Sequence, residues 1–386
     1  FLIYAQNLLH GFYSAPAPNI DLGNGPGYPI LLVPFISLRL PLIFMQLMNA
    51  VFYYLSIVFL FKSLQQIVSF RITIIFSLLW ATYFTFYEQM THVLPEVFAS
   101  SLIPLLIFCI IKAFNNPESK NKKQYIHLSG FIFGYMALTK PIFGYVLMVM
   151  IVGMGLLWVS NRKSMHFKRS MIILLIAFAT TIPYLAYTYH LTGKMFYWSS
   201  FGGNNLYWMS TPYEDETGSW VAYPYNPNLK ENIPGSSALI QSRHKKDLDE
   251  ILKYTGTEQD DAFKRIAIKN IEAYPLKFLK NCFSNAGRIL FNFPYTYETQ
   301  KTGTLLRLPT NGIILVFALF CLIPTLVSWR RILFSIRFML FIAFLYFGGS
   351  LLGSAESRMF AIIVPILFIW IAYIIQRSLK VTLQIE

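Results

Sequence analysis

The chain has 386 residues, of which 55% are hydrophobic and only 13% are charged, and its mean hydropathy is +0.49. This composition excludes an ordinary soluble domain and predicts an integral membrane protein. The formal net charge of +14 does not indicate a nucleic-acid partner, because the lysines and arginines lie mostly in short loops between apolar runs. Cys109, Cys282 and Cys321 are far apart, so neither a disulfide framework nor a metal-binding cysteine cluster is expected.

Residues 1–40 are expected to form a first outer loop. They are rich in aromatic residues, proline, glycine and asparagine up to Pro29, and an apolar segment then runs to Leu38. Apolar stretches of about ten to fourteen residues seldom cross a bilayer, so a re-entrant or interfacial helix is predicted here.

Nine apolar runs follow, and they predict about nine transmembrane helices in an all-α membrane protein. Spanning strands would instead alternate in segments of about ten residues. We expect a helix bundle over residues 41–189, a mainly helical loop domain over 190–308 and C-terminal transmembrane helices over 309–386. The nine runs are 42–61, 72–87, 95–114, 125–140, 142–160, 171–189, 309–328, 332–350 and 359–376.

Basic residues fall on alternate connections between these runs, which is the positive-inside pattern. The pattern places the C-terminus in the cytoplasm, and it places residues 1–40 and 190–308 outside the membrane. The connections expected in the cytoplasm contain Lys62 and Arg71, the 115–123 loop, the 161–169 loop, Arg330 and Arg331, and Arg377 with Lys380.

The long segment 190–308 contains two predicted helices. Residues 257–260 (Thr-Glu-Gln-Asp) resemble a capping box, and apolar residues follow at helical spacing until Tyr274-Pro275 interrupts them. Residues 276–293 form an amphipathic stretch that either lies along the membrane surface or packs inside the loop domain.

The stretch from Tyr87 to Ser101 sets Glu88, His92 and Glu96 between two long apolar runs. A charged side chain near the hydrocarbon boundary faces water, a partner or a substrate, so it is a functional-site hypothesis. Pro95 followed by Glu96 suits a helix start, and a simple helix cap at the interface is the alternative. The three side chains have the chemistry to ligate a divalent cation, but their spacing is common at plain helix ends, so metal dependence is left open.

Further polar groups are expected on the same outer face: Tyr28, Lys140, Asn205, Glu356 and Arg358. A lipid phosphate needs cations, an acceptor hydroxyl or amine needs a carboxylate, and a sugar needs amides and aromatic faces. Each residue also has a plainer explanation, such as a snorkelling interface arginine for Arg358 or a hairpin-end charge for Lys140.

The order of these pieces resembles the polytopic C-type glycosyltransferases that use polyprenyl-phosphate sugars, especially the branch with aminoarabinose and protein O-mannosyl transferases. Six elements carry the resemblance. They are Gly25-Pro26-Gly27-Tyr28-Pro29, Leu94-Pro95-Glu96, residues 134–141 ending in Thr139-Lys140-Pro141, the Gly202–Trp208 loop, the helix from Asp261 to Pro275, and Glu356-Ser357-Arg358 followed by Pro365.

The resemblance implies a membrane enzyme that moves a hexosyl or pentosyl group, with inversion, from a polyprenyl phosphate to a lipid, protein or glycan acceptor. It also implies a site at the extracytoplasmic face of a bacterial plasma membrane. Glu96 matches the family's second acidic position and is the candidate catalytic residue. The candidate substrate-binding residues are Tyr28, Glu88, His92, Lys140, Asn205, Glu356 and Arg358.

The family's principal catalytic aspartate is expected before Phe1, ahead of the Tyr4 stretch, because Asp21 lies too close to the Pro-Gly-Tyr-Pro element to match it. The alternative function is a transporter or flippase of a lipid-linked or amphiphilic substrate. The charged residues lie at helix ends instead of at the bilayer midplane, and no paired interrupted helices suggest inverted repeats, which favours the enzyme. A structural membrane subunit is the third interpretation.

Overall fold

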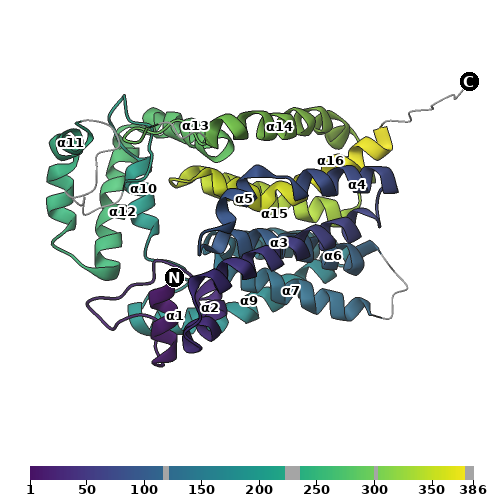
Figure 1. Ribbon diagram of the computed structural model, residues 1–386, viewed down its shortest axis with the longest axis horizontal. Helices are drawn as coiled ribbons and strands as arrows, with labels where there is room; N and C mark the ends of the chain where they lie inside the picture. Colours follow the sequence, from purple (N-terminus) through teal and green to yellow (C-terminus); the bar gives the residue numbers. More distant parts are fainter. Residues whose placement is uncertain (116–120, 222–234, 300–302, 379–386) are drawn as a thin grey trace, which may run out of the picture.

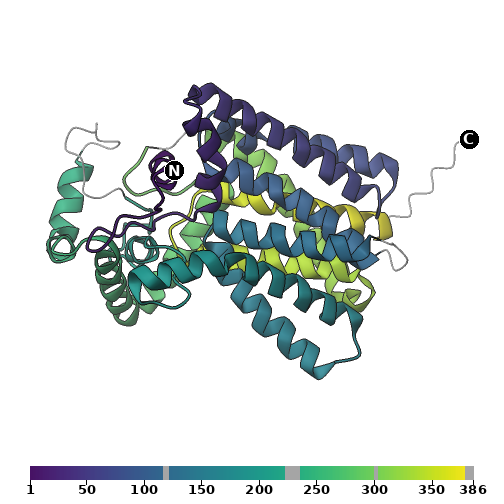
Figure 2. The ribbon, with the colours of Figure 1, turned by 90° about the horizontal axis from the view of Figure 1, so that it is seen from below.

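The computed structural model describes residues 1–115, 121–221, 235–299 and 303–378, and all regular structure in these residues is helical. The predicted all-α class is therefore confirmed. Most helices run side by side along the long axis (Figures 1 and 2). Residues 1–41 and helices α10 to α12 lie at one end of the bundle, which we call the loop end, and the last described turns of α16 lie at the other end (Figure 1). Residues 116–120 of the predicted 115–123 loop, with Lys120, lie outside the described residues, and so does Lys380.

Each of the nine predicted apolar runs lies in helical structure. Among the described residues, seven helices are long and apolar enough to span a membrane, and the number is eight when the pair α4 and α5, bent by 42°, is counted as one span. The ninth run is α7, which begins with Lys122, Lys123 and Gln124 and is less apolar. The helices concerned are α3 (Leu42–Leu64), α4 (Phe70–Ala81), α5 (Phe84–Met90), α6 (Pro95–Asn115), α7 (Lys122–Thr139), α8 (Ile142–Ser160), α9 (Met165–Thr192), α14 (Gly303–Val327), α15 (Phe334–Leu352) and α16 (Phe360–Ser378).

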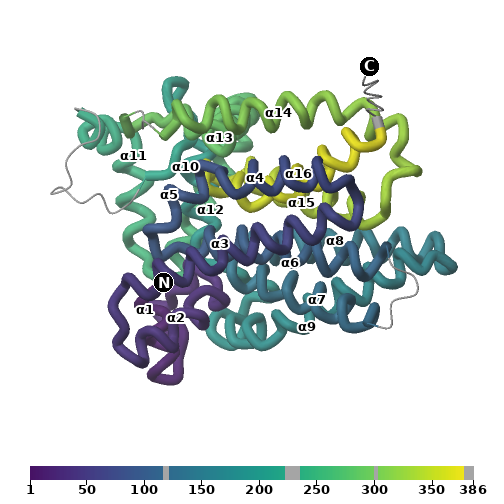
Figure 3. The backbone as a smooth tube through the Cα atoms, turned by 45° about the vertical axis from the view of Figure 1, so that its right-hand side comes forward, coloured from purple at the N-terminus to yellow at the C-terminus, as the bar shows by residue number. Residues whose placement is uncertain are grey.

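Helices α6 and α16 form the interior of the bundle. In each, 78% of the most apolar stretch is buried, whereas only 22% is buried in α3 and α14. Helix α14 runs along the opposite side of the bundle from α7 and α9 (Figure 3). The first turns of α6 and α16 lie at the loop end, so side chains placed there are held by the most buried helices of the fold.

Helix α7 packs against α9 through two glycines. A Cβ atom on Gly130 would lie 2.8 Å from the carbonyl oxygen of Ile173, and one on Gly134 would lie 2.5 Å from that of Ala177. Small residues let helix backbones approach closely, as is common between membrane helices. This packing holds the C-terminal end of α7, and thus Lys140, in a defined position.

The short elements at the loop end agree in part with the predictions. The apolar segment after Pro26 is helix α2 (Gly27–Ser37), which has 11 residues, and it follows the short helix α1 (Leu2–Leu9). Between α9 and α14 lie α10 (Gly202–Met209), α11 (Ser236–Ile251), α12 (Gly256–Ala273) and α13 (Pro275–Phe291). The predicted interruption at Tyr274-Pro275 is confirmed.

The predicted capping box at Thr257 is wrong. Helix α12 begins at Gly256, which has a positive φ of 57° and packs against the backbone of Pro18 and Ile20, and no side chain caps the helix. This contact with the first loop sets the helix start one residue before Thr257. Asp260 instead accepts hydrogen bonds from backbone N–H groups at the start of α10.

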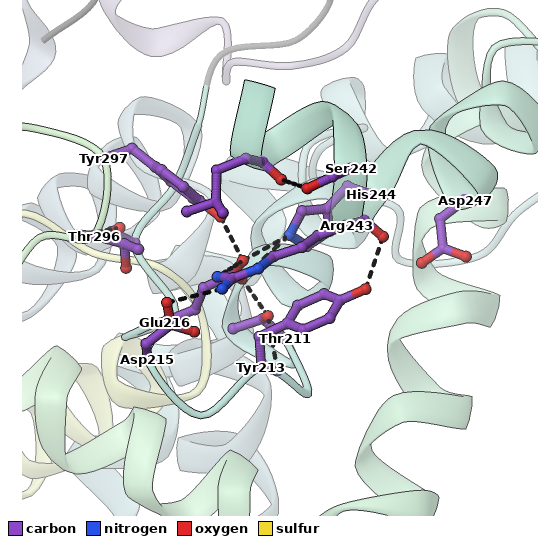
Figure 4. Close-up of polar contacts among 12 residues, drawn as sticks. Thr211, Tyr213, Asp215, Glu216, Ser242, Arg243, His244, Asp247, Thr296 and Tyr297 are labelled. Carbon is purple, nitrogen blue, oxygen red and sulfur yellow. Dashed lines mark hydrogen bonds and ion pairs between the residues drawn. The ribbon is translucent and has the colours of Figure 1, made fainter. Parts of the chain in front are cut away.

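The α10–α13 segment is held together by a buried carboxylate, Glu216, which is 3% exposed (Figure 4). Nε2 of His244 lies 3.1 Å and Nη1 of Arg243 lies 3.2 Å from its Oε1. The hydroxyls of Thr211 and Tyr297 also donate hydrogen bonds to it. Burial alone would raise the pKa of Glu216, but these donors, His244 first, lower the pKa to about 2. Every oxygen of this carboxylate is satisfied within the protein, so the network is structural.

We expect Glu216→Gln to destabilise the protein at neutral pH by on the order of 3 kcal/mol, which is the free energy of the pKa shift. The folded-state pKa is below the unfolded value, so this stability is present above the unfolded pKa and is lost as the pH falls toward about 2. The difference in melting temperature between wild type and variant should therefore shrink as the pH falls from about 7 to about 3. Thermal unfolding in detergent, followed by tryptophan fluorescence, measures it.

The matched control is Glu250→Gln on α11, because Glu250 is exposed and its replacement should change stability by less than about 0.5 kcal/mol. An equal effect of Glu216→Gln at both ends of the pH range would show that the charge of Glu216 does not stabilise the segment.

Candidate active site

Four of the predicted site residues meet at the loop end of the bundle. Glu96 lies in the first turn of α6 and is 5% exposed. Its Oε1 atom is 2.9 Å from Nζ of Lys140, which lies between α7 and α8, and 3.1 Å from Nε of Arg358, which lies in the short helix η2 (Ser357–Met359) before α16. Oε2 of Glu356 is 3.3 Å from the same Arg358 nitrogen. We call these four side chains the Glu96 cluster.

The Glu96 cluster balances two cations with two carboxylates, and its central pair is almost fully enclosed. The side chains of Lys140 and Glu96 are 10% and 6% exposed, whereas those of Arg358 and Glu356 are 28% and 44% exposed. Buried charges are tolerated only when they are paired, because their desolvation is costly. The buried side of the cluster is thus an ion pair, and its accessible side presents Arg358 and Glu356.

Several polar atoms around this ion pair have no hydrogen-bond partner among the described residues. They include Oε2 of Glu96, Oε1 of Gln89 and the hydroxyl of Tyr28, all of them buried. Nε of Arg358 is within ion-pair distance of Glu96 but is not aligned for a hydrogen bond. A cavity of about 10 Å³ lies beside Glu96, Gln89 and Arg358, which is the space of about one water molecule. The site therefore has unused donors and acceptors next to a charged group.

The Gly-Pro-Gly-Tyr-Pro element packs directly on the hairpin that carries Lys140. A Cβ atom on Gly25 would lie 2.1 Å from the carbonyl oxygen of Leu138, and one on Gly27 would lie 2.5 Å from Oγ1 of Thr139. The hydroxyl of Tyr135 donates a 2.7 Å hydrogen bond to the Gly27 carbonyl. Only glycine permits this approach, and it brings the buried Tyr28 within electrostatic range of Glu96.

Asn205 lies near the cluster, in the first turn of α10. Its Cβ atom is 3.8 Å from where a Cβ atom on Gly353 would lie, so α10 approaches the segment that leads to Glu356. Asn285 of α13 fixes that segment, because its side-chain amide donates to the carbonyl oxygens of Ser350 (3.0 Å) and Gly353 (2.7 Å) and its Oδ1 accepts from the Ala355 N–H (3.0 Å).

Glu88 and His92 do not join the Glu96 cluster, which corrects the predicted grouping. Glu88, at the end of α5, forms an ion pair with the buried Arg307 of α14. The ring of His92 is exposed and lies 3.2 Å from the carbonyl oxygen of Glu88. The bend between α4 and α5 turns Glu88 toward α14, so closeness in sequence does not bring it to Glu96. In the described part of the chain, no three His, Cys, Asp or Glu side chains are placed to hold a metal ion.

Sequence reasoning missed Asn285 and Arg307. A lone asparagine in an amphipathic helix carries little information, and its partners lie more than 60 residues away. The sequence did contain a signal for Arg307. This arginine lies immediately before an apolar run, and an arginine at such a position is expected to pair with an acidic side chain.

Comparison with known proteins agrees with the resemblance seen in the sequence. Residues 40–187 match the family model described as dolichyl-phosphate-mannose-protein mannosyltransferase. This match confirms the predicted family resemblance. It covers less than half of the chain and includes Glu96 and Lys140, whereas Tyr28, Asn205, Glu356 and Arg358 lie outside it. No curated protein matches the chain significantly.

Two solved structures of one protein are similar to the fold. ArnT from Cupriavidus metallidurans in the apo state has 9% identity and a TM-score of 0.40, over 95% of this chain and 71% of that chain. The same protein bound to undecaprenyl phosphate has 8% identity and a TM-score of 0.42, over 97% of this chain and 72% of that chain. Both TM-scores are below 0.5.

Proposed function

We propose that the protein is a membrane glycosyltransferase that moves a sugar from a polyprenyl-phosphate donor to an acceptor. The observation that carries the proposal is the Glu96 cluster, in which one carboxylate oxygen holds two cations at the end of the two most buried helices. Two of its members lie inside the residues that match the mannosyltransferase family. A phosphate at the membrane edge needs such fixed cations.

In this proposal Lys140 and Arg358 bind the donor phosphate. Arg358 is the accessible cation, and its guanidinium can turn from Glu356 toward a phosphate that reaches it from the bilayer. Two positive charges in a poorly solvated site also stabilise the negative charge that develops on the leaving phosphate as the bond to the sugar breaks. The isoprenoid tail stays among the helices, so no soluble nucleotide sugar is required.

Glu96 has two proposed tasks. Its Oε1 atom aligns Lys140 and Arg358, and its Oε2 atom, which has no partner among the described residues, accepts a hydrogen bond from the acceptor hydroxyl or amine. Tyr28 lies within electrostatic range of Glu96 and its buried hydroxyl has no partner among the described residues. Glu356 pairs with Arg358, and Asn205 lies against Gly353, three residues before Glu356. We propose Tyr28, Asn205 and Glu356 as contacts for the sugar. Glu88 and His92 are not part of this proposal.

The site is proposed to face outward in a bacterial plasma membrane. The ends of α3 and α14, which lead into connections predicted in the cytoplasm, lie at the opposite end of the bundle from the first turns of α6 and α16, where the Glu96 cluster lies (Figure 1). We therefore propose that residues 1–40 and the 190–308 loop domain are extracytoplasmic, and that the C-terminus, after the helices of 309–386, is cytoplasmic.

Arg358→Ala should weaken the binding of undecaprenyl phosphate to the purified protein in nanodiscs by about tenfold or more, because a charge-assisted hydrogen bond is lost. Equilibrium binding of the labelled lipid phosphate measures the affinity. The matched control is Arg330→Ala, since Arg330 is exposed at the opposite end of the bundle and should leave the affinity unchanged. If Arg358→Ala binds as the wild type does at normal yield, Arg358 only anchors its helix at the interface.

Membrane orientation is tested with single cysteines in a Cys282→Ser background, because the other native cysteines, Cys109 and Cys321, are buried. A cysteine at Glu258, exposed on α12, should react with a membrane-impermeant maleimide in intact cells. A cysteine at Lys163, exposed between α8 and α9, should react only after the membrane is opened. The reverse pattern would place the Glu96 cluster in the cytoplasm and contradict the proposed orientation.

A further inference from the structure

A second site is formed by a cavity of about 270 Å³ that shares no residue with the Glu96 cluster. Its walls come from three segments: residues 19–21 of the first loop, residues 200–204 at the start of α10, and residues 256–263 of α12. A water molecule takes about 30 Å³ of liquid, so the cavity has room for a group several times larger than water. Its volume is close to the lower end of the range for ligand pockets, about 300 Å³.

Hydrogen bonds and close backbone packing connect the segments that line this cavity. The backbone N–H of Ser200 donates to the carbonyl oxygen of Leu22 (3.1 Å), and Oγ of Ser200 accepts from the N–H of Leu22 (3.0 Å). Oγ1 of Thr255 donates to the carbonyl oxygen of Pro18 (3.2 Å), and Gly256 packs tightly against Ile20. The cavity is therefore preformed, which lowers the cost of binding.

Asp260 is the most buried charged group in the cavity wall, with 7% of its surface exposed. Its Oδ1 atom accepts hydrogen bonds from the N–H groups of Gly203 (2.7 Å) and Asn204 (3.2 Å). Its Oδ2 atom accepts none from the described residues. The neighbouring Asp261 pairs with Lys194 (2.5 Å), and Lys194 also lies within electrostatic range of Asp260, which itself forms no ion pair with the described residues. Burial accordingly raises the pKa of Asp260 above its usual value.

Asp21 adds a second carboxylate from the first loop. Its Oδ1 atom accepts hydrogen bonds from the Tyr4 hydroxyl (2.5 Å) and from the Gly23 N–H (3.0 Å), which hold the side chain in place. No lysine or arginine is among the described residues that line the cavity. The remaining lining groups include the amides of Asn19, Asn204 and Gln259, a serine hydroxyl and the ring of Phe201.

This lining selects a chemical class of ligand. Two carboxylates in a lining without lysine or arginine favour a positive group and repel phosphates and carboxylates, and Lys194, which lies outside the lining, pairs with Asp261. The amides and the hydroxyl match hydroxyl groups, and the aromatic ring provides an apolar face. We propose that the cavity binds a protonated amine that also carries hydroxyl groups, with the ammonium between Asp21 and Asp260. We assign the bound amine to the acceptor of the transfer reaction, and this assignment rests on the proposed function.

The test compares D-glucosamine with D-glucose. The two probes have the same ring, and D-glucosamine carries an ammonium group where D-glucose carries one of its hydroxyl groups. Ligand-observed NMR on the purified full chain in nanodiscs should show saturable binding of glucosamine that is about tenfold or more tighter than that of glucose. Asp260→Asn should abolish this preference while keeping Oδ1 as acceptor for the two N–H groups of α10. The matched control is Glu272→Gln, because Glu272 is exposed on the same helix outside the cavity lining, and this variant should bind as the wild type does.

Asp21→Asn removes the charge of the second carboxylate in the cavity and should also weaken the preference for glucosamine. This variant tests the amine site if Asp260→Asn fails to fold. Equal binding of glucosamine by wild type and both variants would overturn the proposal. So would equal binding of glucose and glucosamine, or displacement of glucosamine by magnesium at low concentration, which would mark a cation site.

The affinity for undecaprenyl phosphate reports on the Glu96 cluster and should be unchanged in Asp260→Asn. Failure of the amine site and failure of the proposed function therefore give different results.

Discussion

The geometry of the candidate active site depends on one carboxylate oxygen, Oε1 of Glu96, which holds Lys140 and Arg358 at the same time. Through it the starts of α6 and α16 and the connection from α7 to α8 meet at one point. Removal of one member of such a group leaves an uncompensated buried charge, which typically costs about 3–5 kcal/mol. Buried ion pairs add little net stability compared with apolar packing, so stability alone does not explain why charges occupy this position. In the proposed function the donor phosphate shares these cations, which gives the charges a role.

The two polar sites are connected through the first loop. Gly25 and Gly27 press this loop against the hairpin that carries Lys140, and they place Tyr28 near Glu96. Four residues earlier, Asp21 lines the cavity together with Asp260. The same short stretch thus contacts the Glu96 cluster, which contains two cations, and a cavity whose lining contains two carboxylates and no lysine or arginine among the described residues. Under the proposals above, the first binds the donor phosphate and the second binds an amine of the acceptor.

Much of the helical framework follows from local features of the sequence. Apolar runs predict the membrane helices, Pro95 marks the start of α6, and Tyr274-Pro275 separates α12 from α13. The grouping of Glu96, Lys140, Glu356 and Arg358 was also predictable, because all four lie at helix ends on the same side of the bundle. Glu88 was misplaced because its direction depends on the bend after α4 and on Arg307, which is 219 residues away. The Glu216 network and the role of Asp260 likewise depend on contacts between distant segments, which periodicity does not reveal.

The most direct test of the account is the turnover of Glu96→Gln with radiolabelled polyprenyl-phosphate sugars extracted from the cells of origin. The substitution keeps the shape of the side chain and removes the charge that aligns Lys140 and Arg358. We expect the rate of polyprenyl-phosphate release in reconstituted vesicles to fall about a hundredfold or more, as for other positioned acid–base groups, with elution and thermal unfolding still those of a folded protein. Release at a rate close to that of the wild type would show that Glu96 only caps α6, and the Glu96 cluster would not be the active site.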